Sequence, residues 1–244
     1  MFYKKPIVPN NEKFLIEDIS VLDKNEDSAN GFQLLERVIV GKITLYKKEV
    51  TDAQRSNGTT KYFSTTYYYA EKDQQFANIL ITGLGSKKDD LAALRTFVED
   101  DKEVSGIISI DNFPYNEKMM FKIINRYNLK FFQKPDATDY DKTGSVIFYS
   151  KAGAKKKASL VLKVNDSIDY AWPDKKFLTV KLPLKSPSKV CVSGGEGSTC
   201  RLMQPLSFAA DHYELDYSDA NQLFEIEDRS AVDLQNYIRQ TQSK

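Results

Sequence analysis

The residue types that most often carry covalent or acid–base chemistry are scarce in this chain. Two cysteines, Cys191 and Cys200, lie close together, and His212 is the sole histidine among 244 residues. A serine or cysteine hydrolase needs a positioned base, usually histidine. The composition therefore argues against most enzyme mechanisms, and we expect no catalytic residues, no cofactor and no metal site.

The two cysteines lie in short apolar segments on either side of a glycine- and serine-rich loop, VCVSGGEGSTCRL. This pattern predicts a β-hairpin in which Cys191 and Cys200 face each other. A disulfide that closes so short a loop would contribute about 2.5–3 kcal/mol in the chain-entropy model. The alternative is a pair of reduced, partly buried thiols. We favour the disulfide, which would indicate an oxidising compartment.

The histidine lies in the segment HYELDY, where strand alternation puts His212, Glu214 and Asp216 on one face. These residue types can bind metals, but side chains two apart on a strand converge poorly on one small ion. We interpret this face as the solvated outer side of a sandwich strand.

A run of carboxylates, Glu99, Asp100, Asp101 and Glu103, keeps open the alternative of a carbohydrate-active enzyme that uses paired carboxyl groups. The run lies beside lysines on a predicted helical surface. A glycosidase needs two carboxyl groups at a defined separation in a cleft, and the sequence indicates no cleft there.

The most promising binding surface is the aromatic segment KYFSTTYYYA at residues 61–70. Alternation places Tyr62 and Tyr68 on one face of this strand, and Phe63, Tyr67 and Tyr69 on the other. One face must pack on helices, and the other is suited to stack on a sugar or to meet a partner protein. In the alternative, neighbouring elements cover both faces. The candidate binding residues are Tyr62, Tyr67, Tyr68 and Tyr69.

The elements that would position these residues divide the chain in two. Residues 1–132 predict an α+β module: an antiparallel three-stranded meander over 33–47, 61–70 and 76–82, with Gly41 as a bulge in the first strand. Asn57-Gly58 is the strongest hairpin signal, because a type I′ turn needs positive φ at both central positions.

Helices follow the meander. Ser86 and Asp89 form a capping box before a predicted helix to about residue 98, and a short helix is expected at 102–108. After Pro114, the apolar residues Met120, Ile123, Ile124 and Tyr127 recur at helical spacing, and Asn128 is a plausible end.

Residues 133–143 are polar, contain Pro135 and predict a linker. Residues 144–244 contain eight short apolar runs separated by turn residues, which is typical of an antiparallel β-sandwich, followed by a short C-terminal helix. The predicted fold class is therefore α+β, with a C-terminal antiparallel β-sandwich domain.

The overall composition is that of an ordinary globular protein, with 41% hydrophobic and 28% charged residues. The net charge of +1 argues against a nucleic-acid partner. The longest apolar runs are too short to span a bilayer. The first residues, MFYKKPIVPNN, lack the apolar core of a signal peptide, so we expect either a cytoplasmic protein or a processed chain.

Two resemblances add to this interpretation. Residues of about 32–128, with GKITLYKK, YYYAEKD, LAALRTFVEDD and FPYNEKMMFKIINRYN in this order, resemble a family of uncharacterised exported proteins of Bacteroidota. Residues of about 144–228, with GSVIFYSK, KVNDSIDYAW, FLTVKLP and HYELDY, resemble a small β-sandwich domain found in bacterial envelope proteins. SPS replaces the glycine that this domain has in the turn before Lys189.

The resemblances imply an exported or envelope protein, in the periplasm or at the surface, whose role is structural or in binding. Its partner would be another envelope protein or a glycan. The expected function is thus a non-catalytic binding or structural protein of the bacterial cell envelope. The alternatives are the carbohydrate-active enzyme and a cytoplasmic protein-interaction module.

Overall fold

The computed structural model describes residues 13–17, 32–56, 58–82, 87–110, 113–152, 160–172, 177–194, 197–205, 210–218, 223–229 and 231–242. The chain forms two compact units, Met1–Phe131 and Phe132–Lys244. In coarse terms the fold is α+β and rich in β-sheet. None of the helices among these described residues is long and apolar enough to cross a membrane.

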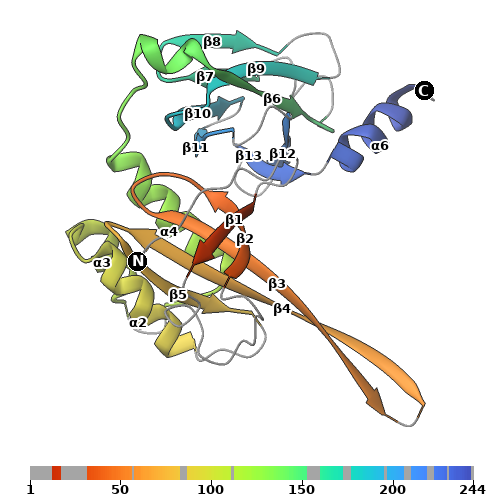
Figure 1. The fold of residues 1–244 in the computed structure, drawn as a ribbon. Coiled ribbons are helices and arrows are strands. Elements are labelled where there is room, and N and C mark those ends of the chain that lie inside the picture. The colour runs from red at the N-terminus through yellow and green to blue at the C-terminus, as the bar shows by residue number, and fades with distance from the viewer. Residues whose placement is uncertain are drawn as a thin grey trace. The chain divides into compact units, whose positions relative to one another are not determined.

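The first unit contains a five-stranded antiparallel sheet whose strands are neighbours in chain order (Figure 1). They are β1 (Lys13–Glu17), β2 (Phe32–Ile39), β3 (Thr44–Ser56), β4 (Thr59–Lys72) and β5 (Gln75–Ile81). β-Branched and aromatic residues dominate these segments, and they suit a pleated, half-buried surface. β3 and β4 are the longest strands, and their far ends extend past β2 and β5.

The single strand predicted over residues 33–47, with a bulge at Gly41, is wrong. The chain reverses direction at residues 40–43, and this reversal separates β2 from β3, which pair antiparallel. Gly41 has a φ of +149°, a conformation that residues with a side chain rarely adopt, so it forms the reversal rather than a bulge.

The hairpin predicted at Asn57-Gly58 is confirmed in its position. Ser56 pairs with Thr59 across the turn, and Gly58 has a φ of +77°. Asn57 itself lies outside the described residues. Residues 51–56, which lie outside the predicted strands, continue β3 to the turn.

Three helices complete the described part of the first unit: α2 (Lys87–Val98), α3 (Lys102–Ile108) and α4 (Glu117–Lys130). The Asp101 side chain caps α3 by accepting hydrogen bonds from the amides of Glu103 and Val104, and Asn116 caps α4 by accepting one from Met119. The predicted cap Ser86 lies outside the described residues.

The core of the first unit lies between the sheet and these helices. The predicted stripe of Met120, Ile123, Ile124 and Tyr127 is buried there, as expected. α4 continues past Asn128 to Lys130, so the predicted end was two residues early. Apolar side chains of the sheet and of α2 and α3 fill the rest of the core: Ile39, Ile43, Leu45, Tyr68, Ala70, Ile79, Leu80, Leu94, Phe97, Val98, Val104 and Ile108.

The second unit contains two four-stranded sheets. One has the order β11 (Ser198–Met203), β10 (Ser188–Ser193), β7 (Val161–Val164) and β8 (Ile168–Ala171). The other has the order β13 (Leu223–Arg229), β12 (Asp211–Ser218), β6 (Thr143–Tyr149) and β9 (Phe177–Pro183). Each of the eight apolar runs contains one of these strands among its described residues.

One strand pair departs from the predicted antiparallel arrangement, because β12 runs parallel to β6. The chain between them passes through β7, β8, β9, β10 and β11 before it returns. A connection of that length permits parallel pairing, which a tight hairpin does not.

Residues 133–143, the predicted linker, are bonded to the second unit. They contain a short 3-10 helix, η1 (Ala137–Asp141). The Tyr140 hydroxyl accepts a hydrogen bond from Asn165 Nδ2 at 2.8 Å, and Asp139 Oδ2 accepts one from Ser186 at 2.9 Å. This segment is therefore part of the second unit rather than a loose connection.

A C-terminal helix, α6 (Ala231–Gln242), packs on the sheet that contains β12. The Tyr237 hydroxyl donates a hydrogen bond to the Ser150 carbonyl at 3.0 Å, and the Tyr237 ring stacks on Tyr149 at 5.0 Å. The helix thus covers a sheet face that the sequence had suggested was exposed to solvent.

Candidate functional site

The four candidate tyrosines do not form one surface. Tyr68 and Tyr69 are buried, with exposed fractions of 4% and 0%, whereas Tyr62 is 72% exposed and Tyr67 is half-buried. The predicted binding surface therefore loses Tyr68 and Tyr69, and of the four tyrosines only Tyr62 presents most of its side chain to solvent.

Tyr68 and Tyr69 are structural because both are buried and pack against other aromatic side chains. The Tyr68 ring packs edge-on against Phe121 at 5.6 Å, and its hydroxyl donates a hydrogen bond to Glu117 at 2.8 Å. Burial, together with Glu117, raises the pKa of Tyr68 above its ordinary value. Tyr69 stacks on Phe76 at 5.7 Å.

Tyr62 lies on a different part of β4, within a projection that we call the arm (residues 50–65). β2 pairs with β3 no farther than Lys47, and β5 reaches β4 no farther than Thr66, which bonds to Thr82. Beyond these residues β3 and β4 continue as a two-stranded ribbon, shown in orange in Figure 1.

The arm exposes two aromatic side chains. Phe63 is 50% exposed and lies on the opposite face from Tyr62, since the two residues are consecutive in a strand. In the register of the hairpin Tyr62 faces Ala53 and Phe63 faces Asp52. From the sequence, Phe63 was expected only to share a strand face with Tyr67 and Tyr69, and it was not among the candidate binding residues. The signal that could have revealed the arm is the long polar, threonine-rich stretch around Asn57-Gly58.

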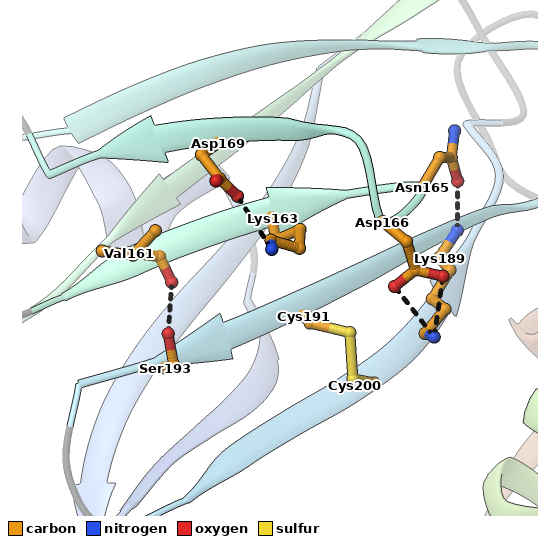
Figure 2. The surroundings of a disulfide bond; sticks show 9 residues. All are labelled: Val161, Lys163, Asn165, Asp166, Asp169, Lys189, Cys191, Ser193 and Cys200. Atoms are coloured by element: carbon orange, nitrogen blue, oxygen red, sulfur yellow. Dashed lines mark hydrogen bonds and ion pairs between the residues drawn. A yellow bond between two sulfur atoms is a disulfide. The ribbon is translucent and has the colours of Figure 1, made fainter.

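The two cysteines form a disulfide between β10 and β11, with the sulfur atoms 2.03 Å apart. Cys191 and Cys200 are directly opposite each other in the antiparallel register. Figure 2 shows the bond beside the polar side chains of the sheet, where Lys163 pairs with Asp169 at 3.5 Å and Lys189 with Asp166 at 3.0 Å.

The disulfide lies on the outer face of its sheet, because Val190 and Val192, which flank Cys191, point into the core. Both cysteines are half-buried. The bond therefore ties the two strands together without contributing to the apolar core.

The face predicted for His212, Glu214 and Asp216 is not uniformly solvated. Glu214 is buried, and its carboxylate pairs with Lys151 at 3.1 Å and with Arg229 at 2.9 Å. The hydrogen bond to Glu214 raises the pKa of the Arg229 guanidinium. The interpretation of this face as a solvated surface is wrong at Glu214, because α6 covers the same side of the sheet.

Three carboxylates of the run, Asp100, Asp101 and Glu103, lie in an ion-pair network. Lys72 Nζ contacts Asp100 at 2.8 Å, and Lys130 Nζ contacts Asp101 at 2.8 Å and Glu103 at 2.5 Å. Hydrogen bonds from Lys130 hold the pKa of Asp101 and of Glu103 below their ordinary values. Such carboxylates are ionised and paired with cations, whereas a glycosidase acid needs a raised pKa.

Across the described part of the chain, no group of three or more His, Cys, Asp and Glu side chains is arranged to hold a metal ion. The features that remain for function are the arm and the disulfide-linked sheet. No protein-family model, no curated protein and no solved structure matches this chain.

Proposed function

We propose that this protein is a non-catalytic binding or structural protein of the bacterial cell envelope, and that it meets its partner through the arm. The observation that carries the proposal is the exposure of Tyr62 and Phe63 on a two-stranded ribbon beyond the rest of the sheet. Aromatic side chains are enriched at protein interfaces and dominate their binding energy.

The low intrinsic stability of the arm supports a binding role. An isolated two-stranded ribbon is marginally stable in water, and three or more strands or a packed face are needed for independent stability. The residues from Thr51 to Arg55 and from Thr59 to Ser64 are exposed, so the arm adds little to the core. A ribbon that does little for the fold is well placed to contact another molecule.

Two features support the location. The disulfide between Cys191 and Cys200 fits an oxidising compartment such as the periplasm or the cell surface. The resemblance of residues of about 32–128 to exported proteins of Bacteroidota points the same way. The finer architecture that we infer is a meander in the first unit and a β-sandwich in the second, whose buried residues come from both four-stranded sheets.

The proposal is tested by placing a photo-crosslinking amino acid at Tyr62 in the bacterium that makes the protein. A matched control carries it at Lys122, an exposed residue on α4. We expect a discrete crosslinked product in the envelope fraction for Tyr62 and none for Lys122. Equal labelling at both positions, no product at Tyr62, or a cytoplasmic protein with two free thiols would contradict the proposal.

A further inference from the structure

The disulfide between Cys191 and Cys200 is partly open to solvent. Both cysteines are half-buried on the outer face of their sheet, whereas Val190 and Val192 point into the core. β11, which holds Cys200, is an edge strand among the described strands of this sheet. Exposed disulfides exchange with other thiols more readily than buried ones, because the attacking sulfur must reach the bond.

The pairing of β10 with β11 does not depend on this bond. The Lys189 carbonyl accepts a hydrogen bond from the Asn165 amide at 2.8 Å, so the backbone groups of Lys189 point to the side of β7. Every second residue of an antiparallel strand repeats this direction, so the backbone groups of Cys191 point to β7 as well. The ladder between β10 and β11 therefore uses Val190 and Val192, and it remains when the disulfide is broken.

The two cysteines differ in the cations around them. Lys163 of β7 is directly opposite Cys191 in the register, on the outer face of the sheet, and Figure 2 shows it on the strand beside Cys191. Lys189 lies two residues before Cys191 on the same face of β10. Arg201, which follows Cys200, alternates to the other face. Lys163 is thus nearer to Cys191 than to Cys200, which lies one strand farther away.

Two carboxylates partly offset these cations. Lys163 Nζ lies 3.5 Å from Asp169, and Lys189 Nζ lies 3.0 Å from Asp166. Asp169 is on β8, two strand spacings or about 9–10 Å from Cys191, whereas Lys163 is one spacing or about 4.8 Å away. Because the interaction between two charges weakens with distance, a negative charge on Cys191 is attracted by Lys163 more than it is repelled by Asp169.

We propose that this disulfide is a thiol-exchange site, at which a dithiol reduces the bond in the folded protein and Cys191 is the sulfur that leaves as a thiolate. A nearby ammonium group stabilises a thiolate, and a stabilised thiolate leaves faster. The inference goes beyond the proposed function and does not rest on the arm.

The exchange has two steps. One thiolate of the dithiol attacks Cys200 Sγ and forms a mixed disulfide, while the electron pair of the broken bond goes to Cys191 Sγ. The second thiolate of the dithiol then attacks the sulfur that the first one contributed, releases the Cys200 thiolate and closes the reagent into its own disulfide. Two electrons and two protons pass from the dithiol to the two cysteines.

The first experiment asks whether the folded full-length chain reacts. It is reduced with dithiothreitol over a wide range of concentration, and the released thiols are counted by alkylation. We expect a rate proportional to the dithiothreitol concentration throughout. A rate that levels off at the unfolding rate of the chain would overturn the proposal, because the bond would then be reached only after unfolding. A parallel series with reduced thioredoxin shows whether the site favours a protein dithiol or a small one.

The second experiment identifies the sulfur that is attacked. The chain is treated briefly with glutathione, a monothiol, in the presence of an alkylating reagent that traps the released thiolate, and its peptides are mapped by mass spectrometry. We expect most adducts to carry glutathione on Cys200 and the alkyl group on Cys191. Equal amounts of the two possible adducts, or glutathione mainly on Cys191, would overturn the proposal.

The third experiment varies the charge opposite Cys191. Lys163→Gln should slow reduction about threefold and Lys163→Glu about tenfold, and salt should shrink both effects. Lys163→Arg keeps the charge and should react as the unmodified chain does. Lys185→Gln, at an exposed lysine of the same unit, is the matched control and should change nothing. A variant that merely loses stability would be reduced faster, not slower. A Lys163→Glu chain that reacts as fast as the unmodified chain at low salt would overturn the proposal.

Discussion

Asn128, in the last turns of α4, holds the chain reversal at Gly41 in place. Its Oδ1 accepts a hydrogen bond from the Ile43 amide at 2.8 Å, and its Nδ2 donates to the carbonyls of Val40 at 3.2 Å and Ile43 at 2.8 Å. A Cβ added to Gly41 would lie 2.5 Å from the same Nδ2. One buried amide side chain thus fixes the loop that separates β2 from β3.

Asn128→Ala should therefore destabilise the first unit. It would leave the Ile43 amide and two carbonyls without their partner in the interior, at a cost of about 3 kcal/mol. Thermal or denaturant unfolding followed by circular dichroism measures this change. Lys122→Ala, on the exposed side of the same helix, is the control and should change stability by less than about 0.5 kcal/mol. A loss no larger than that of Lys122→Ala would show that water satisfies the loop.

The network around Asp100 should make the first unit sensitive to acid. Desolvation raises the pKa of Asp100, but hydrogen bonds from Lys72 and from the Tyr127 hydroxyl outweigh it, so the folded pKa lies below the ordinary value. The stabilisation is then present above the unfolded pKa of about 3.9 and is lost as pH falls through the folded pKa.

Asp100→Asn should flatten this dependence. The difference in unfolding free energy between pH 6 and low pH should be smaller in the variant than in the unmodified chain, because the variant has no carboxylate at this position to protonate. Glu99→Gln is the control, since it changes a neighbouring exposed carboxylate. Identical pH profiles for the unmodified chain and Asp100→Asn would mean that the ion pair with Lys72 contributes nothing.

The segment before β6 should stabilise the second unit although the sequence suggests a linker. A fragment of residues 132–244 should unfold cooperatively, and a fragment of 143–244 should be less stable by about 2–3 kcal/mol, because it loses three hydrogen bonds. These are the bonds from Asn165 to Tyr140, from Ser186 to Asp139 and from the Leu184 amide to the Lys142 carbonyl.

Tyr140→Phe in the longer fragment removes only the hydrogen bond from Asn165 and leaves the other two in place. It should cost about 1 kcal/mol, well below the effect of the truncation. If the two fragments unfold at the same denaturant concentration, the contacts of residues 137–142 are dispensable and the segment behaves as a linker.

Local patterns in the sequence were sufficient to predict the elements that depend on neighbouring residues alone. The stripe from Met120 to Tyr127 and the turn between Ser56 and Thr59 appear where helical spacing and turn chemistry place them. The reversal at Gly41 was missed because it depends on Asn128, which is far away in the chain. β-Propensity alone does not distinguish a bulge from a reversal.

The candidate site shows the same difference between what local patterns predict and what depends on distant contacts. Alternation correctly separates the faces of the aromatic strand, but it does not say which neighbours cover them, so Tyr68 and Tyr69 could not be identified as buried. Glu214 was missed for a similar reason: its charge suggests an exposed position, yet Lys151 and Arg229 neutralise it beneath α6. Both outcomes depend on tertiary contacts that have no local signal.

The disulfide between Cys191 and Cys200 should stabilise the second unit by closing a short hairpin in the unfolded chain. Replacing both cysteines by serine should lower the unfolding free energy by about 2.5–3 kcal/mol in the chain-entropy model. Both sulfur atoms lie on the half-buried outer face, so the loss should come from the unfolded chain rather than from a cavity in the core.

Reduction of the unmodified chain gives an independent measurement. Reductant should lower its unfolding temperature toward that of the double-serine variant and leave the variant unchanged. Thiol titration of the protein isolated from its host, with thiols blocked at lysis, should find no free thiol. Two titratable thiols in that sample would show that the cysteines are reduced where the protein works, and would remove the main structural support for an oxidising compartment.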